Sequence, residues 1–390
     1  MEQIIVSDNQ PPLCLLCQRP RLSAVADSSW TSMSVTSDLR LWPGAAEIVV
    51  CDHCGHAQKT IDGHYLRKTK DIYSTYKMYP ASAGKEPTVI TDQSMAPRSD
   101  VIVKWLTEVA SLPSAGRMLD LGCGNGGALS SFGHAYNTWE LYGYELDRQN
   151  EKTILSIPGV KGFFTEKMDN VKGVFDIVTM FHLIEHIPGP IEFMNRARAL
   201  IAPGGLALIE SPDITQNPFD LLVMDHCSHF SPGSMRYLVA RSGFETVKLR
   251  NDLVPKEISA LATPEERSVE AVEDEQHRGN AVIVSAISWL ENLAEDAALC
   301  AKSQPFGILG AGIGGTWLAG VLADKVSFFV DEDPSRCGKV HLGKRVISLS
   351  QAPEGACVYL PFPPAIARKI KERLTEIYPS VRLVEPPEPK

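Results

Sequence analysis

A glycine-rich turn between a predicted strand and a predicted helix restricts the fold of this chain more than any other feature. Residues 118–127 read MLDLGCGNGG, an apolar run that ends at Asp120 and continues through Gly122, Gly124 and Gly126. A helix then begins at residues 128–132, with its free N–H groups directed into the turn. Glycines here let the backbone approach a ligand closely, although a plain turn or a dinucleotide site is also compatible with the spacing.

Strand and helix patterns alternate around this turn. RMLDLGCG, ELYGYELD, GFFTE, FDIVTMFH and LALIESPD are strand-like, with a helix in FMNRARALIAPGG. This alternation predicts an α/β fold over residues 101–250, with a parallel sheet covered on both faces. After a helical stretch at 280–303, a second strand and glycine turn (FGILGAGIGG) begins at Phe306. It predicts a smaller, Rossmann-like domain within residues 251–390.

The length of 390 residues predicts more than one domain. We expect a small metal-stabilised module at residues 1–70 and a connecting arm with several tyrosines at 71–100. A formal net charge of −9 gives no general attraction to nucleic acid or to an anionic membrane. The sequence has no run of 18 apolar residues and no signal-peptide pattern, which predicts a cytoplasmic protein. It leaves the oligomeric state open.

Four of the nine cysteines form two CxxC pairs, Cys14 with Cys17 and Cys51 with Cys54. Each pair can present two thiolates from one tight turn to a tetrahedral ion, for which zinc is the usual occupant. Four cysteines leave no open position for water, so we predict a structural site. His53 or His56 replacing one ligand is an alternative. Redox chemistry is another, but neither pair stands at a helix start after a strand.

Four motifs in order resemble those of class I S-adenosylmethionine (SAM) dependent methyltransferases: LDLGCGNGG, the acidic residue ending LYGYELD, FDIVTMFHLIEHIPGP and APGGLALIESP. The resemblance implies that the glycine loop holds SAM and that Glu145 accepts hydrogen bonds from both ribose hydroxyls. It also implies that Glu166 to Met168 lie beside the adenine and His182 near the methionine end. The implied loop residues are Asp120, Gly122, Cys123, Gly124, Asn125 and Gly126.

Nearly the whole chain resembles the three-domain sugar C-methyltransferases, which act on nucleotide-linked ketosugars in deoxysugar biosynthesis. The CxxC pairs match that family's zinc module, and FGILGAGIGG, FFVDEDPSRCGK and YLPFP match its C-terminal domain. In the family that domain helps to enclose the sugar nucleotide and is not expected to bind a dinucleotide. The segment MDHCSHFSP departs from the pattern, with Asp225 in place of a glutamate and Val223 in place of a frequent tyrosine.

The resemblance implies carbon methylation through an enolate. His226 is the candidate base, because a histidine can remove a proton near neutral pH when a carboxylate tunes its pKa. Asp225 or another carboxylate would orient it. His186 would hydrogen-bond the developing enolate oxygen, and the arm would bring Tyr76 or Tyr79 toward the same place.

Other interpretations remain open. The same fold could methylate a sugar hydroxyl, or the chain could be a binding or scaffold protein without catalysis. His186 could be structural, the tyrosines could simply pack, and His226 and His229 around Cys227 could bind a second metal. Gly310, Gly312 and Gly315 with Asp331 could bind NAD.

Overall fold

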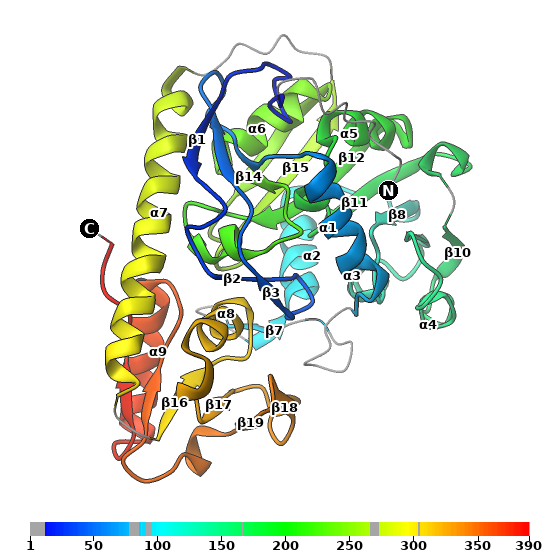
Figure 1. Cartoon of the computed structure of the whole chain (residues 1–390). Coiled ribbons are helices and arrows are strands. Elements are labelled where there is room, and N and C mark those ends of the chain that lie inside the picture. Colours follow the sequence, from blue (N-terminus) through cyan, green and yellow to red (C-terminus); the bar gives the residue numbers. More distant parts are fainter. Residues whose placement is uncertain are drawn as a thin grey trace.

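The computed structural model describes residues 12–77, 86, 88–90, 95–165, 167–265, 273–302 and 305–389. Figure 1 shows two sheets along the molecule, with the long helix α7 (Glu273–Cys300) lying along one side of both.

The N-terminal part forms a small antiparallel sheet in the order β1-β4-β5-β13. Its first three strands come from the region of the CxxC pairs, whereas β13 comes from the middle of the chain, so that His229 pairs with Ala57. The hairpin of β2 and β3 lies between β1 and β4 in the sequence, and the helix α1 follows β5. The bounds are β1 Leu22–Ala26, β2 Met33–Val35, β3 Leu41–Pro43, β4 Ile48–Cys51, β5 Ala57–Lys59, α1 Gly63–Ser74 and β13 Ser228–His229.

The central sheet has seven strands in the order β10-β9-β8-β11-β12-β15-β14. The first five are parallel, and β15 runs antiparallel between β12 and β14. Buried apolar side chains lie on both faces of this sheet, as expected for a sheet that helices cover on both sides. The strands are β8 Arg117–Leu121, β9 Glu140–Tyr144, β10 Val160–Phe164, β11 Phe175–Phe181, β12 Ile201–Pro212, β14 Phe244–Arg250 and β15 Glu257–Pro264.

Helices connect these strands and cover the sheet (Figure 1). They are α2 Arg98–Val109, α3 Gly127–Ala135, α4 Glu151–Leu155, α5 Pro190–Ala199 and α6 Pro232–Arg241. Short 3-10 turns stand at Met168–Asn170, Ile184–His186 and Pro218–Leu222, and β6 Thr88–Ile90 pairs with β7 Met95–Pro97 ahead of α2.

The C-terminal part has a six-stranded sheet in the order β18-β19-β17-β16-β20-β21, parallel except at β18. Its first strand leads through the second glycine turn into α8. The bounds are β16 Phe306–Leu309, α8 Ile313–Leu322, 3-10 turn Ala323–Lys325, β17 Phe328–Val330, β18 Val340–His341, β19 Lys344–Ile347, 3-10 turn Leu349–Gln351, β20 Cys357–Tyr359, α9 Pro364–Ile377 and β21 Arg382–Val384.

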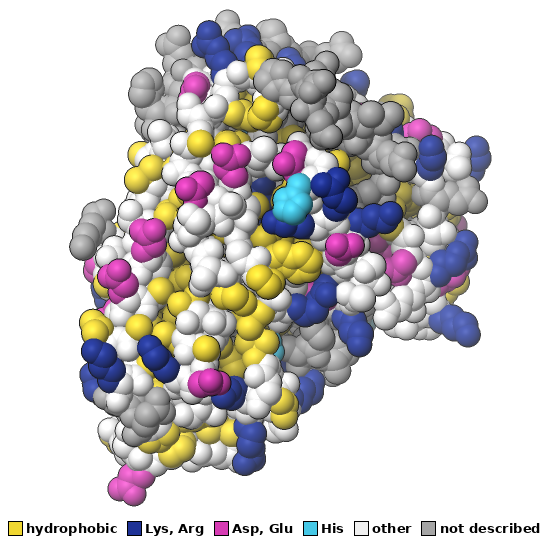
Figure 2. Space-filling view, viewed as in Figure 1, with side chains coloured by type: hydrophobic (Ala, Val, Ile, Leu, Met, Phe, Trp, Pro, Cys, Tyr) yellow, Lys and Arg dark blue, Asp and Glu magenta, His cyan; other side chains and the backbone are white. Residues whose placement is uncertain are grey.

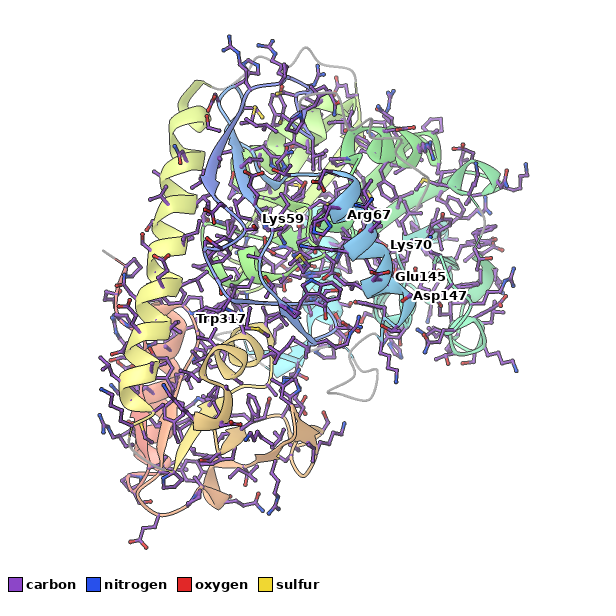
Figure 3. All side chains as sticks on the ribbon, viewed as in Figure 1. Lys59, Arg67, Lys70, Glu145, Asp147 and Trp317 are labelled. Carbon is purple, nitrogen blue, oxygen red and sulfur yellow. The ribbon has the colours of Figure 1, made fainter. Side chains whose placement is uncertain are left out.

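Aromatic packing joins the C-terminal part to the rest of the chain. Phe219 meets Trp289 of α7 and Trp317 of α8 edge-to-face, with ring centroids 5.4 and 6.4 Å apart. Trp317, labelled in Figure 3, also donates a hydrogen bond from Nε1 to the hydroxyl of Thr31 at 3.2 Å. The segment around residue 219 is therefore held from both sides.

Two elements of the structure extend across predicted domain boundaries. We expected the central domain to end at residue 250, but β15 pairs with β12 and β14, so the central sheet extends to Pro264. This strand pairs with the backbone N–H and C=O groups along the edge of β12, which would otherwise be unpaired. The predicted boundary at residue 70 falls inside α1.

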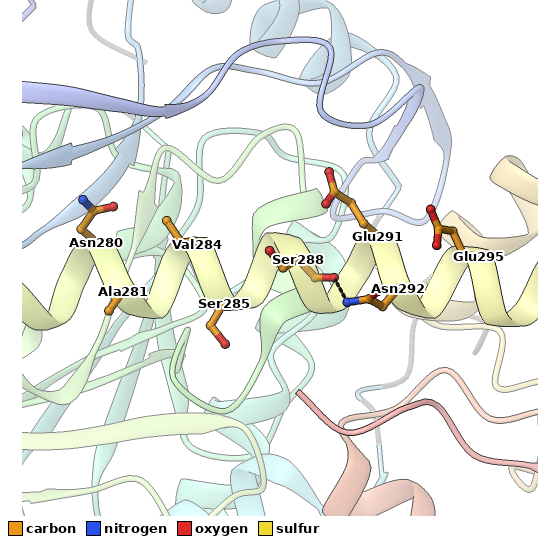
Figure 4. Close-up of a pocket in the computed structure, with 8 residues that line it drawn as sticks. All are labelled: Asn280, Ala281, Val284, Ser285, Ser288, Glu291, Asn292 and Glu295. Atoms are coloured by element: carbon orange, nitrogen blue, oxygen red, sulfur yellow. Dashed lines mark hydrogen bonds between the residues drawn. The ribbon is translucent and has the colours of Figure 1, made fainter. Parts of the chain in front are cut away.

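The described residues include no helix long and apolar enough to span a membrane. A shallow, open pocket lies along the exposed face of α7 (Figure 4). All of its lining residues belong to that one helix: Asn280, Ala281, Val284, Ser285, Ser288, Glu291, Asn292 and Glu295. None of the predicted site residues is among them.

The second glycine turn gives a test of the C-terminal packing. A Cβ on Gly315 would lie 2.0 Å from the carbonyl oxygen of Gly310, whereas one on Gly312 would meet no atom within 4 Å. We expect Gly315→Ala to lower the free energy of unfolding by about 1–3 kcal/mol because α8 must move away. Gly312→Ala, the matched control, should cost less than about 1 kcal/mol. Urea unfolding measures both, and equal effects would contradict the packing.

Candidate functional site

The four predicted metal ligands come together. The sulfurs of Cys14 and Cys54 are 3.5 Å apart, as are those of Cys17 and Cys51, and all four lie within 4.8 Å of one another. The side chains are 0–8% exposed, and none forms a disulfide. Turns at Gln18 and Gly55, both with positive φ, bend the chain around each pair. Four sulfurs in one buried cluster fit a tetrahedral zinc ion.

The two neighbouring histidines stay outside this cluster. His53 Nδ1 lies 3.2 Å from Arg19 Nη1, and His56 Nε2 lies 3.2 Å from the hydroxyl of Ser228. The alternative in which a histidine replaces one cysteine is therefore wrong, because both rings point to other partners.

The glycine loop between β8 and α3 has the backbone that its sequence predicts. Gly122, Gly124 and Gly126 have φ values of 71°, 53° and 83°, a region that side chains rarely adopt. The N–H groups of Gly122 and Cys123 donate to the carbonyl of Tyr144, which ties the loop to the end of β9.

Glu145 lies immediately after β9 and beside this loop. Its carboxylate accepts hydrogen bonds from the backbone N–H groups of Gly124 (3.1 Å) and Leu146 (2.7 Å). These bonds orient the carboxylate next to the turn, although burial raises its pKa above the usual value. Figure 3 shows Glu145 and Asp147 on the segment that follows β9.

The side chains of several other predicted SAM-site residues are buried in the protein interior. Asp120 is buried and accepts a 2.6 Å hydrogen bond from Thr179 Oγ1, and burial raises the pKa of its carboxyl to about 7. Cys123 is 5% exposed, with its sulfur against Gly143, so its backbone is the part that can face a ligand. Met168 is also buried, in a core cluster with Tyr144. Asn125 stands in the turn, near Gly127. Glu166 lies outside the described residues.

A buried carboxylate, Asp220, bridges two histidines. Its Oδ1 lies 2.6 Å from His226 Nδ1 and its Oδ2 lies 2.5 Å from His229 Nδ1. A carboxylate only accepts, so both rings carry hydrogen on Nδ1. The neutral form of His226 therefore has its bare nitrogen at Nε2. The alternative of a metal held by His226 and His229 around Cys227 is not supported, because among the described residues the ligand atoms close enough to His226 to share an ion belong to Glu185 and His186, not to His229 and Cys227.

The second predicted histidine, His186, lies against His226 with ring centroids 4.5 Å apart and the rings perpendicular. Its Nδ1 lies 2.9 Å from the hydroxyl of Tyr73 and 3.0 Å from the carbonyl oxygen of Asp225. The carbonyl can only accept, which places hydrogen on Nδ1. A neutral His186 then has a bare Nε2 and cannot donate a hydrogen bond to an enolate oxygen.

Asp225 forms hydrogen bonds with Ser37 and not with the ring of His226. Its carboxylate accepts hydrogen bonds from the backbone N–H of Ser37 (2.8 Å) and from the Ser37 hydroxyl (2.5 Å). Tyr76 lies beside it, with its hydroxyl 3.4 Å from Ser37 Oγ. Tyr79 falls outside the described residues, and Tyr73 is the tyrosine that contacts His186.

Charges around the two histidines give them different pKa values. Burial alone would lower the pKa of His226, but Asp220, with help from Glu185 and Asp225, raises it above the usual value. Burial and the proximity of His226 lower the pKa of His186. His226 is thus the stronger base of the pair.

Lys59 lies behind this cluster and is fully buried. Its ammonium group donates to the carbonyl of Val223, and burial lowers its pKa to about 8 despite Asp220 and Asp225. It connects β5 of the N-terminal sheet to the segment that carries the histidines.

His182 follows β11, where Leu183 packs against Gly122 of the glycine loop. Its ring lies among carboxylates, with Nδ1 3.3 Å from Glu185 and Nε2 3.1 Å from Glu257.

The second glycine turn, in the C-terminal part, has Asp331 beside it. The carboxylate of Asp331 accepts a hydrogen bond from the N–H of Ala311 and forms an ion pair with Arg336. These internal partners use the oxygens that an NAD ribose would need.

Basic side chains lie on the face formed by α1. Arg67 and Lys70 are exposed and Lys68 is partly exposed, and Figure 3 shows the first two on this helix. Figure 2 shows lysine and arginine side chains gathered over this part of the surface. The negative net charge of the chain therefore does not extend to this face.

Residues 97–249 match the family model described as a methyltransferase domain. The ubiquinone biosynthesis O-methyltransferase of Dechloromonas aromatica is 29% identical over 30% of this chain and 51% of its own length. The C-methyltransferase NovU of Streptomyces niveus is 30% identical over 30% of this chain and 29% of its own. The chain spans about half the length of the O-methyltransferase relatives named first.

A putative methyltransferase from Bacillus halodurans has a solved structure that matches 41% of this chain and 95% of its own, with 13% identity and a TM-score of 0.33. The family match, with the strand order of the central sheet, identifies a SAM-dependent methyltransferase domain of the class I α/β fold.

Glu145 gives a test of the predicted donor site. Replacing Glu145 by Gln removes the charged acceptor for the ribose hydroxyls, and we expect about 10- to 100-fold weaker binding of SAM or S-adenosylhomocysteine in calorimetry. Glu140→Gln is the control, because Glu140 lies at the other end of β9 with a side chain 50% exposed. Unchanged affinity in Glu145→Gln would contradict this role.

Proposed function

We propose that this protein transfers the methyl group of SAM to a carbon next to the carbonyl of a nucleotide-activated ketosugar. The observation that carries the proposal is the buried Asp220–His226 pair beside His186 and Tyr73. Carbon becomes a nucleophile only after it loses a proton, and a histidine whose pKa a carboxylate raises is suited to remove one near neutral pH. The match to a protein named C-methyltransferase supports the same chemistry.

In the proposed reaction, Nε2 of His226 takes the proton from the carbon next to the carbonyl. The C–H electron pair moves into the enolate, and the hydroxyl of Tyr73 donates a hydrogen bond to the enolate oxygen. The carbon then attacks the SAM methyl group, the C–S bond breaks, and its electron pair remains on sulfur as S-adenosylhomocysteine leaves. His226 finally returns its proton to solvent.

Tyr73 takes the donor role that the sequence suggested for His186. Its hydroxyl can accept from the Nδ1–H of His186, 2.9 Å away, and still has its own proton to give. Burial raises the pKa of Tyr73, which keeps this proton in place at neutral pH. His186 then positions Tyr73, and Tyr76 lies in ring contact with it, with centroids 5.7 Å apart.

The basic face of α1 supports an anionic acceptor. Arg67, Lys68 and Lys70 offer charges that suit a nucleoside diphosphate, although the chain as a whole carries a formal charge of −9. A nucleotide carrier on the sugar would use this local attraction.

Methylation of a sugar hydroxyl is the second candidate. Several relatives are named O-methyltransferase, and the same His226 base could deprotonate a hydroxyl. Val223 also stands where the sugar C-methyltransferases often have a tyrosine, and it is 3% exposed.

Analysis of the products formed from SAM and a panel of nucleotide ketosugars distinguishes carbon methylation from methylation of a hydroxyl. We expect NMR to show a new methyl group on carbon, next to the carbonyl, with one S-adenosylhomocysteine released per methyl. An O-methyl product, or methylation of the matched sugar without a ketone, would reject the carbon-methylation proposal in favour of the second candidate.

We also propose that Cys14, Cys17, Cys51 and Cys54 hold a structural zinc ion. The cluster fits this metal, and the β5–β13 pairing extends its sheet to His229. Zinc would thus steady the segment that carries the Asp220 pair.

Purified protein should contain one zinc per chain by elemental analysis. Cys54→Ser should lose the metal and lower the melting temperature, because an open cluster leaves three buried thiols without a common ligand. Cys300→Ser, outside the cluster and partly exposed, should keep the zinc. A zinc-free wild-type protein of the same stability would contradict the assignment.

A further inference from the structure

We propose that His182, Glu210 and Glu257 form a second, divalent-metal site beside the glycine loop. One ligand atom from each lies within 4.8 Å of the other two. That spacing suits three ligands around one ion, since metal–oxygen and metal–nitrogen bonds of about 2.0–2.2 Å separate ligand atoms by up to about 4.4 Å. A small inward adjustment of the side chains would complete the site.

Glu210 gives the strongest indication of a missing ligand. It is 0% exposed, and neither carboxylate oxygen accepts a hydrogen bond from an N–H or O–H group of the described residues. The group beside it is the carboxylate of Glu257, with which it can hydrogen-bond only when one of the two carboxyl groups carries a proton. A buried carboxylate without partners is costly, and buried charges are normally paired or bind metals. Its oxygens face His182 and Glu257, where an ion would satisfy them.

The surroundings of His182 resemble those of a metal-binding histidine. Its Nδ1 lies 3.3 Å from the fully buried carboxylate of Glu185, which leaves Nε2 toward Glu257 at 3.1 Å. Metal-binding histidines usually donate their other ring N–H to a carboxylate, which fixes the ring. The backbone of His182 also has a φ of 50°, a strained value that often marks a functional position.

Three adjacent strands bring these residues together. His182 follows β11, Glu210 lies on β12 and Glu257 begins β15, and the N–H of His182 donates to the carbonyl of Glu210 at 2.9 Å. The carboxyl ends of parallel strands are the edge where α/β sheets bind ligands. Two carboxylates neutralise a divalent ion, while Arg98 holds the other oxygen of Glu257 at 3.4 Å.

One imidazole and two carboxylates favour a borderline ion such as Mn²⁺ or Fe²⁺ over one that prefers thiolates. Three protein ligands would leave positions for water or for an oxygen of the acceptor. Glu185 connects this site to the histidine pair, because it also lies within 4.8 Å of His186 and His226. The ion could thus polarise the acceptor oxygen. That use rests on the proposed function, but the binding itself does not.

The test is Mn²⁺ binding to the zinc-loaded protein. Calorimetry and electron paramagnetic resonance measure the binding. We expect one bound Mn²⁺ per chain. Glu210→Gln and His182→Gln should weaken binding at least about 10-fold, and Glu185→Gln about 10- to 100-fold through loss of the ring's partner. Glu140→Gln, exposed on β9, is the control and should bind normally.

Circular dichroism and thermal unfolding show whether each variant is folded. Absence of stoichiometric Mn²⁺ binding to the wild type would overturn the proposal and indicate a proton shared between Glu210 and Glu257. Equal Mn²⁺ affinity in wild type and in a folded Glu210→Gln would overturn it as well. Neither result bears on methyl transfer, so failure of this site and failure of the proposed function are distinguishable.

Discussion

The bridge that Asp220 makes between His226 and His229 is the interaction on which the rest of the candidate site depends. One buried carboxylate can accept a hydrogen bond from each of two imidazole rings only if both rings are held in place. His229 pairs with Ala57 of β5, and Ala57 pairs with Val50 of β4, the strand that ends at Cys51 of the cysteine cluster. Phe219, next to Asp220, packs against α7 and α8. Both flanking parts of the chain thus support one carboxylate inside the methyltransferase domain.

The two histidines at the centre have different roles because they have different partners. His226 faces a carboxylate, which raises its pKa, whereas Nδ1 of His186 faces a carbonyl and a tyrosine hydroxyl, and burial lowers its pKa. Two imidazoles 4.5 Å apart cannot both carry charge without repulsion. His226 is therefore the more basic of the two rings, and another group must stabilise the enolate oxygen. In the proposed reaction that group is Tyr73, whose hydroxyl lies 2.9 Å from His186 Nδ1.

Features set by neighbouring residues could be predicted from the sequence. The glycine loop and the CxxC pairs are local, since their backbone and chemistry follow from a few adjacent residues. Contacts between distant segments could not be predicted. Ser37 binds Asp225 across 188 positions. Asp220 sits in an apolar stretch, PFDLLV, that gives no sign of its burial against two histidines. The spacing of Tyr73, Tyr76 and Tyr79 likewise did not indicate which hydroxyl meets His186. The resemblance indicated which segments to compare, and the contacts between distant segments in the fold give each of these residues its partners.

Proton exchange in heavy water shows whether His226, oriented by Asp220, removes a proton from carbon. The protein is incubated with a nucleotide ketosugar and S-adenosylhomocysteine, so that no methyl group can be transferred, and NMR follows the proton next to the carbonyl. We expect exchange in the wild type, loss of exchange in His226→Gln and slower exchange in Asp220→Asn. Wild-type exchange no faster than in buffer, with a ketosugar that the protein methylates, would contradict this role of His226, as would equal exchange in His226→Gln.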